Sequence, residues 1–255
     1  MSPRLLFPAL LVATACHGAV APGLIEKSSA WEKIALGEYV VENNTWNTSA
    51  VRPGSVWRQS VFADPATDAM GWRWDFSGQD DTIKSFPEII YGKKAFAAYA
   101  STTPRLPMPL DRARFRLEYD YAARAAGTYN TSTDITFTDS AQAGEKNVRA
   151  KLMIWFDHQN MPFFNPAQVT RAVIAGRPHR VFIDRNHDDA DGKWIYIALL
   201  PDDLPASGEL NLREYFEYLR SAGVLQPGWF LASIEIGSEI ANGSGEITFR
   251  RFVVH

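Results

Sequence analysis

The sequence predicts a strand near the C-terminal end of the chain, and two carboxylates lie on one side of that strand. In the segment 234–240, Glu235 and Glu239 share one face because side chains alternate along a strand, and the isoleucines take the other face. Asp134 belongs to a polar row in the strand expected over 129–138, opposite an apolar row. We therefore expect these carboxylates to face one wet groove, and a groove lined by carboxylates and aromatic rings suits a carbohydrate.

A cation shares this expected groove. In the strand predicted over 151–157, Lys151, Met153 and Trp155 point to one side, and the residues between them form an apolar face that belongs in the core. Burial disfavours a charged ammonium, but a neighbouring anion favours it. The charge state of Lys151 therefore depends on which groups lie beside it.

The composition limits the partners. The chain has 255 residues, a formal net charge of -3 and a pI near 6.0, without the basic stripe that nucleic acids or anionic membranes require. A neutral partner such as a polysaccharide fits better, and we expect a monomer. The sequence holds no motif for a metal, redox or nucleotide cofactor, so we expect none. The acidic segment 184–192 lacks the full ligand series of a calcium loop and is typical of a hairpin.

The first residues predict export. An apolar run over 5–15 follows a basic residue and precedes small residues ending at Ala21, which is typical of a signal peptide over 1–21 and of a secreted protein, extracellular or periplasmic. The only cysteine, Cys16, lies inside this segment, so the mature chain would have no disulfide. Lipidation of Cys16, which would attach the protein to a membrane, is the less favoured alternative because Ala13 stands where a lipoprotein signal usually has leucine.

The rest of the sequence predicts an all-β protein. Segments that alternate polar and apolar residues recur along the chain, and turn signals separate several of them. This density of strands indicates one antiparallel β-sandwich domain over 38–255, with 22–37 as an N-terminal lead-in. Strands are expected over 38–42, 114–121, 129–138, 151–157, 180–184, 194–200, 231–240 and 246–254.

One helix is predicted to begin after Asn211 and to end near Gly223. Asn211 can cap it, and Glu214 can complete a capping box. Its apolar stripe, which should pack on the outside of a sheet, consists of Leu212, Tyr215, Phe216 and Leu219.

Several short motifs, in the same order, resemble those of glycoside hydrolase family 12, the endo-β-1,4-glucanases and xyloglucanases. The segment 41–47 is similar to the family's Asn-x-Trp segment, and 86–92 is similar to its Tyr-Pro-x-x-x-Tyr-Gly segment. Further matches are Leu106-Pro107-Met108-Pro109, Asp134, Lys151-Leu152-Met153-Ile154-Trp155 and Gly237-Ser238-Glu239. The resemblance covers the chain from about residue 38 to its C-terminus.

The resemblance implies a fold and a site. The fold would be a jelly-roll, concanavalin-like sandwich with one packed helix and a glucan-binding groove open at both ends. Glu239 would be the general acid/base, and Asp134 the acidic residue beside the nucleophile. The substrate-binding residues would be Asn44, Trp46, Met153, Trp155 and Glu235, with Trp46 stacking on a glucosyl ring.

One position departs from the family pattern. The family's nucleophile is a glutamate, and the matching position holds Lys151. Because the resemblance places Asp134 beside this position, we expect Lys151 to stay charged and to form an ion pair with Asp134. A protonated ammonium cannot attack the anomeric carbon, and it repels the positive charge that develops there. Two functions therefore stay open: a glucan-binding protein that has lost hydrolysis, and an endo-β-1,4-glucanase or xyloglucanase whose rearranged mechanism uses Glu239 with Asp134. A lectin-like protein that recognises another protein has no residue in its favour.

Each site residue also has a purely structural interpretation. Trp46 could belong to the core, and Glu239 would be a solvated strand residue if the family match were absent. Glu235 is equally compatible with a groove and with a structural role. Met153 and Trp155 would also be expected in a strand that a sandwich buries on both faces.

Overall fold

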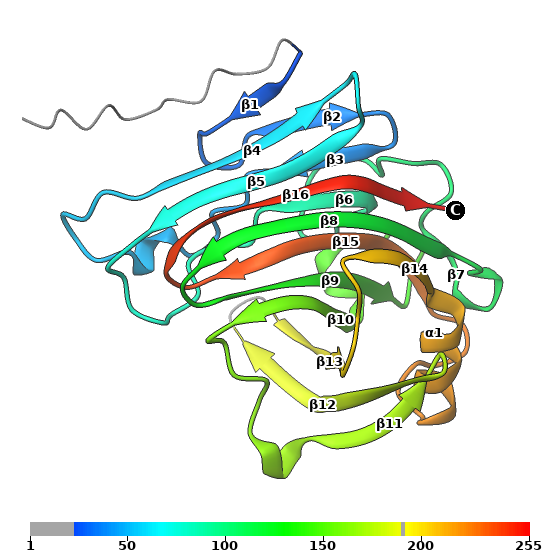
Figure 1. Cartoon of the computed structure of the whole chain (residues 1–255). Coiled ribbons are helices and arrows are strands. Elements are labelled where there is room, and N and C mark those ends of the chain that lie inside the picture. Colours follow the sequence, from blue (N-terminus) through cyan, green and yellow to red (C-terminus); the bar gives the residue numbers. More distant parts are fainter. Residues whose placement is uncertain (1–22, 190–191) are drawn as a thin grey trace, which may run out of the picture.

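The computed structural model describes residues 23–189 and 192–255 as two sheets packed face to face (Figure 1). The predicted signal peptide, its cleavage site and Cys16 lie outside the described residues. The expected β-sandwich is confirmed, because nearly all of the regular structure consists of strands and most pairings are antiparallel. Short 3₁₀ helices lie at Thr48–Ala50, Leu110–Arg112, Glu145–Asn147 and Pro166–Gln168.

The smaller sheet has six strands in the order β1-β4-β5-β16-β8-β14. They are β1 (Ile25–Lys27), β4 (Arg58–Asp64), β5 (Ala69–Phe76), β8 (Arg116–Ala126), β14 (Ser207–Asn211) and β16 (Gly243–Val254). Alternation in β8 is as predicted, since Leu117 and Tyr119 are buried while Asp120 pairs with Arg250 at 2.5 Å on the exposed face.

The larger sheet has the order β11-β12-β13-β10-β9-β15-β6-β3-β2, and β7 pairs with β15 beside this path. Its first strands along the chain are β2 (Lys33–Leu36), β3 (Tyr39–Glu42), β6 (Glu88–Gly92), β7 (Met108–Pro109) and β9 (Tyr129–Thr138). The others are β10 (Val148–Gln159), β11 (Thr170–Ile174), β12 (Arg177–Asp189), β13 (Gly192–Pro201) and β15 (Phe230–Ile240). All these pairings are antiparallel except that between β10 and β13, which is parallel.

The main core lies between the two sheets and sets which way the groove residues face. Leu152 and Ile154 of β10 are fully buried there, as are Ile135 and Phe137 of β9, so the alternate residues of both strands must point away from the smaller sheet. The predicted division of these strands into a core face and a second face is confirmed. It places the polar row of β9 and the lysine-containing row of β10 side by side.

The helix α1 (Leu212–Ser221) confirms the predicted position and apolar stripe, but two details of the prediction are wrong. The Asn211 side chain makes no capping bond to the backbone; it donates a 2.7 Å hydrogen bond to the Glu214 carboxylate instead. The helix also does not lie outside a sheet. It contacts β8 of one sheet and β11 of the other, and Phe216 packs edge-on against Phe137 in the main core. The helix α1 therefore lies at one end of the sandwich (Figure 1).

Two other expectations concern single segments. The predicted lead-in contributes β1 to the smaller sheet and β2 to the larger one, so it is part of the sandwich and does not precede it. The acidic segment forms the predicted hairpin, with Asp189 opposite Gly192 at the ends of β12 and β13.

Over 23–189 and 192–255, no group of three or more potential ligands could hold a metal ion. No helix in these ranges is long and apolar enough to cross a membrane.

Candidate functional site

A groove of about 960 Å³ lies on the larger sheet, on the face that points away from the smaller sheet. Seven of the eight expected site residues line it: Asn44, Trp46, Asp134, Lys151, Met153, Glu235 and Glu239. Trp155 does not line the groove. It is only 2% exposed, and its ring packs edge-on against Phe163 in a separate apolar cluster beside the groove.

Lys151 and Asp134 form the expected ion pair. Lys151 Nζ donates to Asp134 Oδ2 at 2.6 Å, across the neighbouring strands β10 and β9. Burial alone would lower the pKa of Lys151, but the charges of Asp134 and then Glu235 outweigh it and raise the pKa above its ordinary value. The ammonium also lies over the rings of Phe96 and Trp194, at 5.1 and 5.6 Å from their centroids. Lys151 is therefore firmly held, and its neighbours favour the charged ammonium.

Glu239 lies on β15, further along the groove. Burial raises its pKa to about 7, the hydrogen bond from Asn130 Nδ2 opposes the rise, and the negative charge of Asp134 adds to it. The side chain therefore holds a proton for part of the time at neutral pH, as a general acid must. Its interpretation as an ordinary solvated strand residue is wrong.

A second charged cluster lies in the groove floor. Lys94 Nζ lies 2.5 Å from a carboxylate oxygen of Glu42 and 2.5 Å from one of Glu88, and Asn44 Nδ2 donates to Glu88 at 2.8 Å. Burial of Glu235, followed by the neighbouring charge of Glu88, raises the pKa of Glu235 well above its ordinary value. In the groove floor, the positive charge of Lys94 therefore compensates the neighbouring carboxylates of Glu42 and Glu88.

Four polar atoms of groove-lining residues are buried and have no hydrogen-bond partner in the part of the chain that the structure describes. They are Glu88 Oε2, Tyr99 Oη, Asp134 Oδ1 and Trp194 Nε1. Carboxylate oxygens accept hydrogen bonds, an indole nitrogen donates one, and a phenol does both. Because these atoms are inaccessible to solvent, they are unsatisfied inside the groove wall and floor and are not displayed to a ligand.

Aromatic side chains are spread along the groove. Trp46 is 51% exposed, so its interpretation as a core residue is wrong, and Trp31 is 46% exposed. Met153, although only 4% exposed, lines the groove and accepts a hydrogen bond of 2.7 Å from the Tyr196 hydroxyl.

Several residues that line the groove could not be identified from the sequence. Glu42 and Lys94 stand at the end of a strand and in a loop, where charged residues are usually solvated, and nothing nearby in the chain indicates that they meet. Glu88 could have been found from the alternation in 88–92 only after the strand order was known. The other groove-lining residues not anticipated include Trp31, Phe96, Tyr99, Phe164, Phe182, Trp194 and Tyr196.

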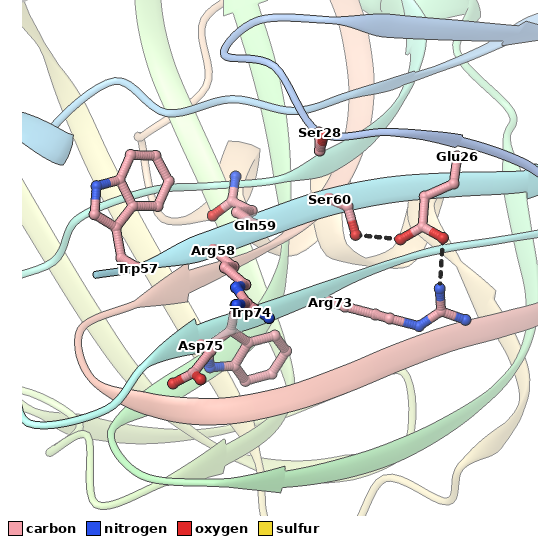
Figure 2. Close-up of a pocket in the computed structure, with 9 residues that line it drawn as sticks. All are labelled: Glu26, Ser28, Trp57, Arg58, Gln59, Ser60, Arg73, Trp74 and Asp75. Carbon is pink, nitrogen blue, oxygen red and sulfur yellow. Dashed lines mark hydrogen bonds and ion pairs between the residues drawn. The ribbon is translucent and has the colours of Figure 1, made fainter. Parts of the chain in front are cut away.

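A second concavity of about 740 Å³ lies beside β1, β4 and β5, apart from the groove (Figure 2). Its own side chains engage one another: Ser60 Oγ donates to Glu26 at 2.5 Å, and Arg73 Nη1 lies 3.0 Å from the same carboxylate (Figure 2). None of the residues that line it lines the groove. The acidic residues and the exposed tryptophans identified above gather in the groove instead.

Comparisons with known proteins agree with this architecture. Endoglucanase S from Pectobacterium parmentieri is 25% identical over 251 residues, covering 96% of this chain and 92% of that protein. The probable xyloglucan-specific endo-beta-1,4-glucanase A of Aspergillus fumigatus is 20% identical, covering 93% of this chain and 94% of its own length. The solved family 12 xyloglucanase from Bacillus licheniformis superposes with a TM-score of 0.81 at 24% identity, over 91% of this chain and 99% of its own. The family model for glycosyl hydrolase family 12 matches residues 37–255, and the chain belongs to that family.

Proposed function

We propose that the protein binds β-1,4-glucan or xyloglucan chains along the groove and does not hydrolyse them by the retaining double displacement. The ion pair between Lys151 and Asp134 carries this proposal. A retaining glycosidase needs a nucleophilic carboxylate about 5 to 5.5 Å from its acid/base. We assign that nucleophile position to Lys151, whose raised pKa keeps it cationic and unable to attack a sugar carbon.

Other features of the groove support binding. Exposed Trp46 and Trp31 offer flat apolar surfaces against which sugar rings can stack. The endoglucanase and xyloglucan-specific relatives favour a β-glucan as the ligand.

One observation favours a second function, residual hydrolysis by a rearranged mechanism. Glu239 has a pKa of about 7, which suits a general acid, and the charge of Asp134 acts on it directly. In that case Asp134 would serve as the displaced nucleophile, or as the base that activates water in an inverting reaction.

The decisive experiment measures both binding and turnover. Reducing-end release from xyloglucan, barley β-glucan and carboxymethylcellulose is followed for the unmodified protein, Lys151→Glu and Lys151→Glu/Glu239→Gln, together with binding of the same polymers by affinity electrophoresis. Lys151→Gln is the matched control, because it removes the cation without adding a carboxylate.

The proposal predicts that the unmodified protein and Lys151→Gln bind but release no sugar. Lys151→Glu should gain activity that Glu239→Gln then abolishes. Sugar release by the unmodified protein that depends on Glu239 would support the second function and reject the first. Absence of binding to all three polymers would reject both.

Export is a separate proposal. We propose that residues 1–21 are removed during secretion, on the basis of the apolar run over 5–15. Mass spectrometry of the protein recovered from its native host tests this. A chain that begins near residue 22 supports it, and an intact or lipid-modified N-terminus contradicts it.

A further inference from the structure

The loop that follows β10 has a strained backbone. Asn160 and Phe164 both have positive φ angles, 53° and 46°. Two three-residue turns accompany them: Met161 N donates to Gln159 O at 2.7 Å, and Phe164 N donates to Pro162 O at 3.1 Å. Asparagine tolerates this conformation, but a bulky residue such as phenylalanine rarely adopts it.

The rest of the loop holds this conformation in place. Asn160 Nδ2 donates to Gly127 O at 2.9 Å, and Asn165 Oδ1 accepts from Ala167 N at 3.0 Å, where a 3₁₀ helix begins. Behind the loop, Phe163 is buried against Trp155. Strain that is maintained in this way tends to occur where a side chain must be presented in one orientation.

The strained residue presents a ring to the groove. Phe164 stacks on Phe182 of β12 with a centroid distance of 3.8 Å and an interplanar angle of 2°. Tyr196 packs edge-on against Phe164 at 5.8 Å and fixes the position of the stack. All three residues line the groove, and both phenylalanines are partly exposed. The stack is therefore a rigid, flat apolar surface at the groove wall.

This surface and Trp46 lie at opposite ends of the groove. Trp46 follows β3, and Phe182 belongs to β12, which is six strand positions away in the order β12-β13-β10-β9-β15-β6-β3. At about 4.8 Å per position, these six positions span roughly 29 Å along the sheet. The charged residues Asp134, Lys151 and Glu235 belong to strands between them.

We propose that Phe164 and Phe182 form a second sugar platform, so that the ligand is an internal stretch of β-glucan long enough to reach from Trp46 to Phe164. This inference rests on the proposed function, because it assumes that a glucan occupies the groove. Aromatic faces pack against the apolar faces of pyranose rings, and two distant platforms make affinity depend on chain length.

The test compares a long and a short ligand, cellohexaose and cellotriose, by isothermal titration calorimetry on the full chain. The variants are Phe164→Ala, Phe164→Tyr, Trp46→Ala and the double variant Trp46→Ala/Phe164→Ala. Val173→Ala is the surface control, since Val173 is 70% exposed on β11 and does not line the groove. Melting temperatures show whether each variant is folded.

We expect Phe164→Ala to weaken cellohexaose binding about tenfold and Phe164→Tyr to change it less than threefold. The losses from Trp46→Ala and Phe164→Ala should be additive for cellohexaose because the two sites are far apart. For cellotriose, too short to reach both platforms, the fold-loss caused by Phe164→Ala should be clearly smaller.

Two results would overturn the inference. The first is an unchanged cellohexaose affinity in folded Phe164→Ala, and the second is an equal loss for both ligands. Either result leaves the proposed function intact as long as the unmodified protein binds. Failure of the unmodified protein to bind any glucan rejects the proposed function itself.

Discussion

Lys94 and Glu88 are joined by a contact of 2.5 Å in the groove floor, where their side chains are 10% and 1% exposed. Glu42 accepts a second contact of 2.5 Å from the same ammonium and is 2% exposed. Both carboxylates are removed from bulk water, and Lys94 is the cation that they share. Removing one partner of a buried ion pair leaves an uncompensated charge, which costs far more than the intact pair contributes.

The first prediction follows from this contact. Lys94→Met should lower the free energy of unfolding by about 3 to 5 kcal/mol, because Glu42 and Glu88 lose their shared cation. Chemical denaturation measures the change. Lys33→Met is the matched control: Lys33 also contacts Glu42, at 3.1 Å, but is 40% exposed, so its loss should cost less than about 1 kcal/mol. Equal effects of the two variants would contradict the prediction.

The second prediction concerns Lys151 and Asp134. Their side chains are 19% and 14% exposed, so partial solvation reduces the cost of breaking the pair. Lys151→Met should destabilise the protein by about 1 to 3 kcal/mol, because it leaves the Asp134 carboxylate in the groove floor without its cation. Adding Asp134→Asn to Lys151→Met should recover part of the loss. Chemical denaturation of both single variants and the double variant measures the energetic coupling between Lys151 and Asp134. Stability losses that are independent and additive would contradict this prediction.

The third prediction concerns pH. Burial raises the pKa of Glu239 from 4.5 to about 7, so between these values the folded state holds a proton that the unfolded state has released. The unfolded state then binds fewer protons, and stability falls as the pH rises through this window. The contribution is about 3 kcal/mol. Glu239→Gln should remove this decline, and unfolding measured from pH 4 to pH 8 for both proteins tests it. Parallel pH profiles would contradict it.

The fourth prediction concerns Gly237, which lies between Glu235 and Glu239 on β15. A Cβ atom at this position would lie 2.6 Å from Phe86 Cε1 and 2.7 Å from Pro87 O. Gly237→Ala should therefore displace Phe86, which lines the groove, costing about 1 to 3 kcal/mol of stability and weakening glucan binding.

Gly144→Ala is the control for this variant, because its Cβ would meet only Asn147 Oδ1 at an ordinary 3.5 Å and its φ of -83° suits alanine. Denaturation and affinity electrophoresis are compared for both variants. A Gly237→Ala protein that is as stable and binds as tightly as Gly144→Ala would contradict the prediction.

The local sequence pattern predicts much of this fold. Alternation places Leu152 and Ile154 in the core and Lys151 on the opposite face, because side chains in a strand alternate regardless of what the sheet packs against. The ion pair with Asp134 is likewise predictable, since the family motifs place both residues on neighbouring strands. The position of the helix is marked by Asn211 and by its apolar stripe.

Features that depend on distant segments are not predictable in this way. Lys94 meets Glu42 across 52 residues of sequence, and no periodicity connects a loop lysine with the end of a strand. Trp155 looks like a groove residue from alternation alone. It is buried because Phe163, in the following loop, covers its face. The Asn211 side chain could satisfy either the backbone or Glu214, and only the folded geometry decides between them.

The parallel pairing of β10 with β13 has a consequence for how the groove is assembled. Parallel neighbours cannot be joined by a tight turn, so after β10 the chain first forms β11 and β12 at the edge of the same sheet and then returns beside β10 as β13. That excursion carries Phe164 and Phe182, whereas Asp134, Glu235 and Glu239 belong to β9 and β15. Insertions, deletions or grafts between the two parallel strands can thus remodel one end of the groove without shifting the central carboxylates. The fold thus carries the two phenylalanines on a different stretch of chain from the three carboxylates.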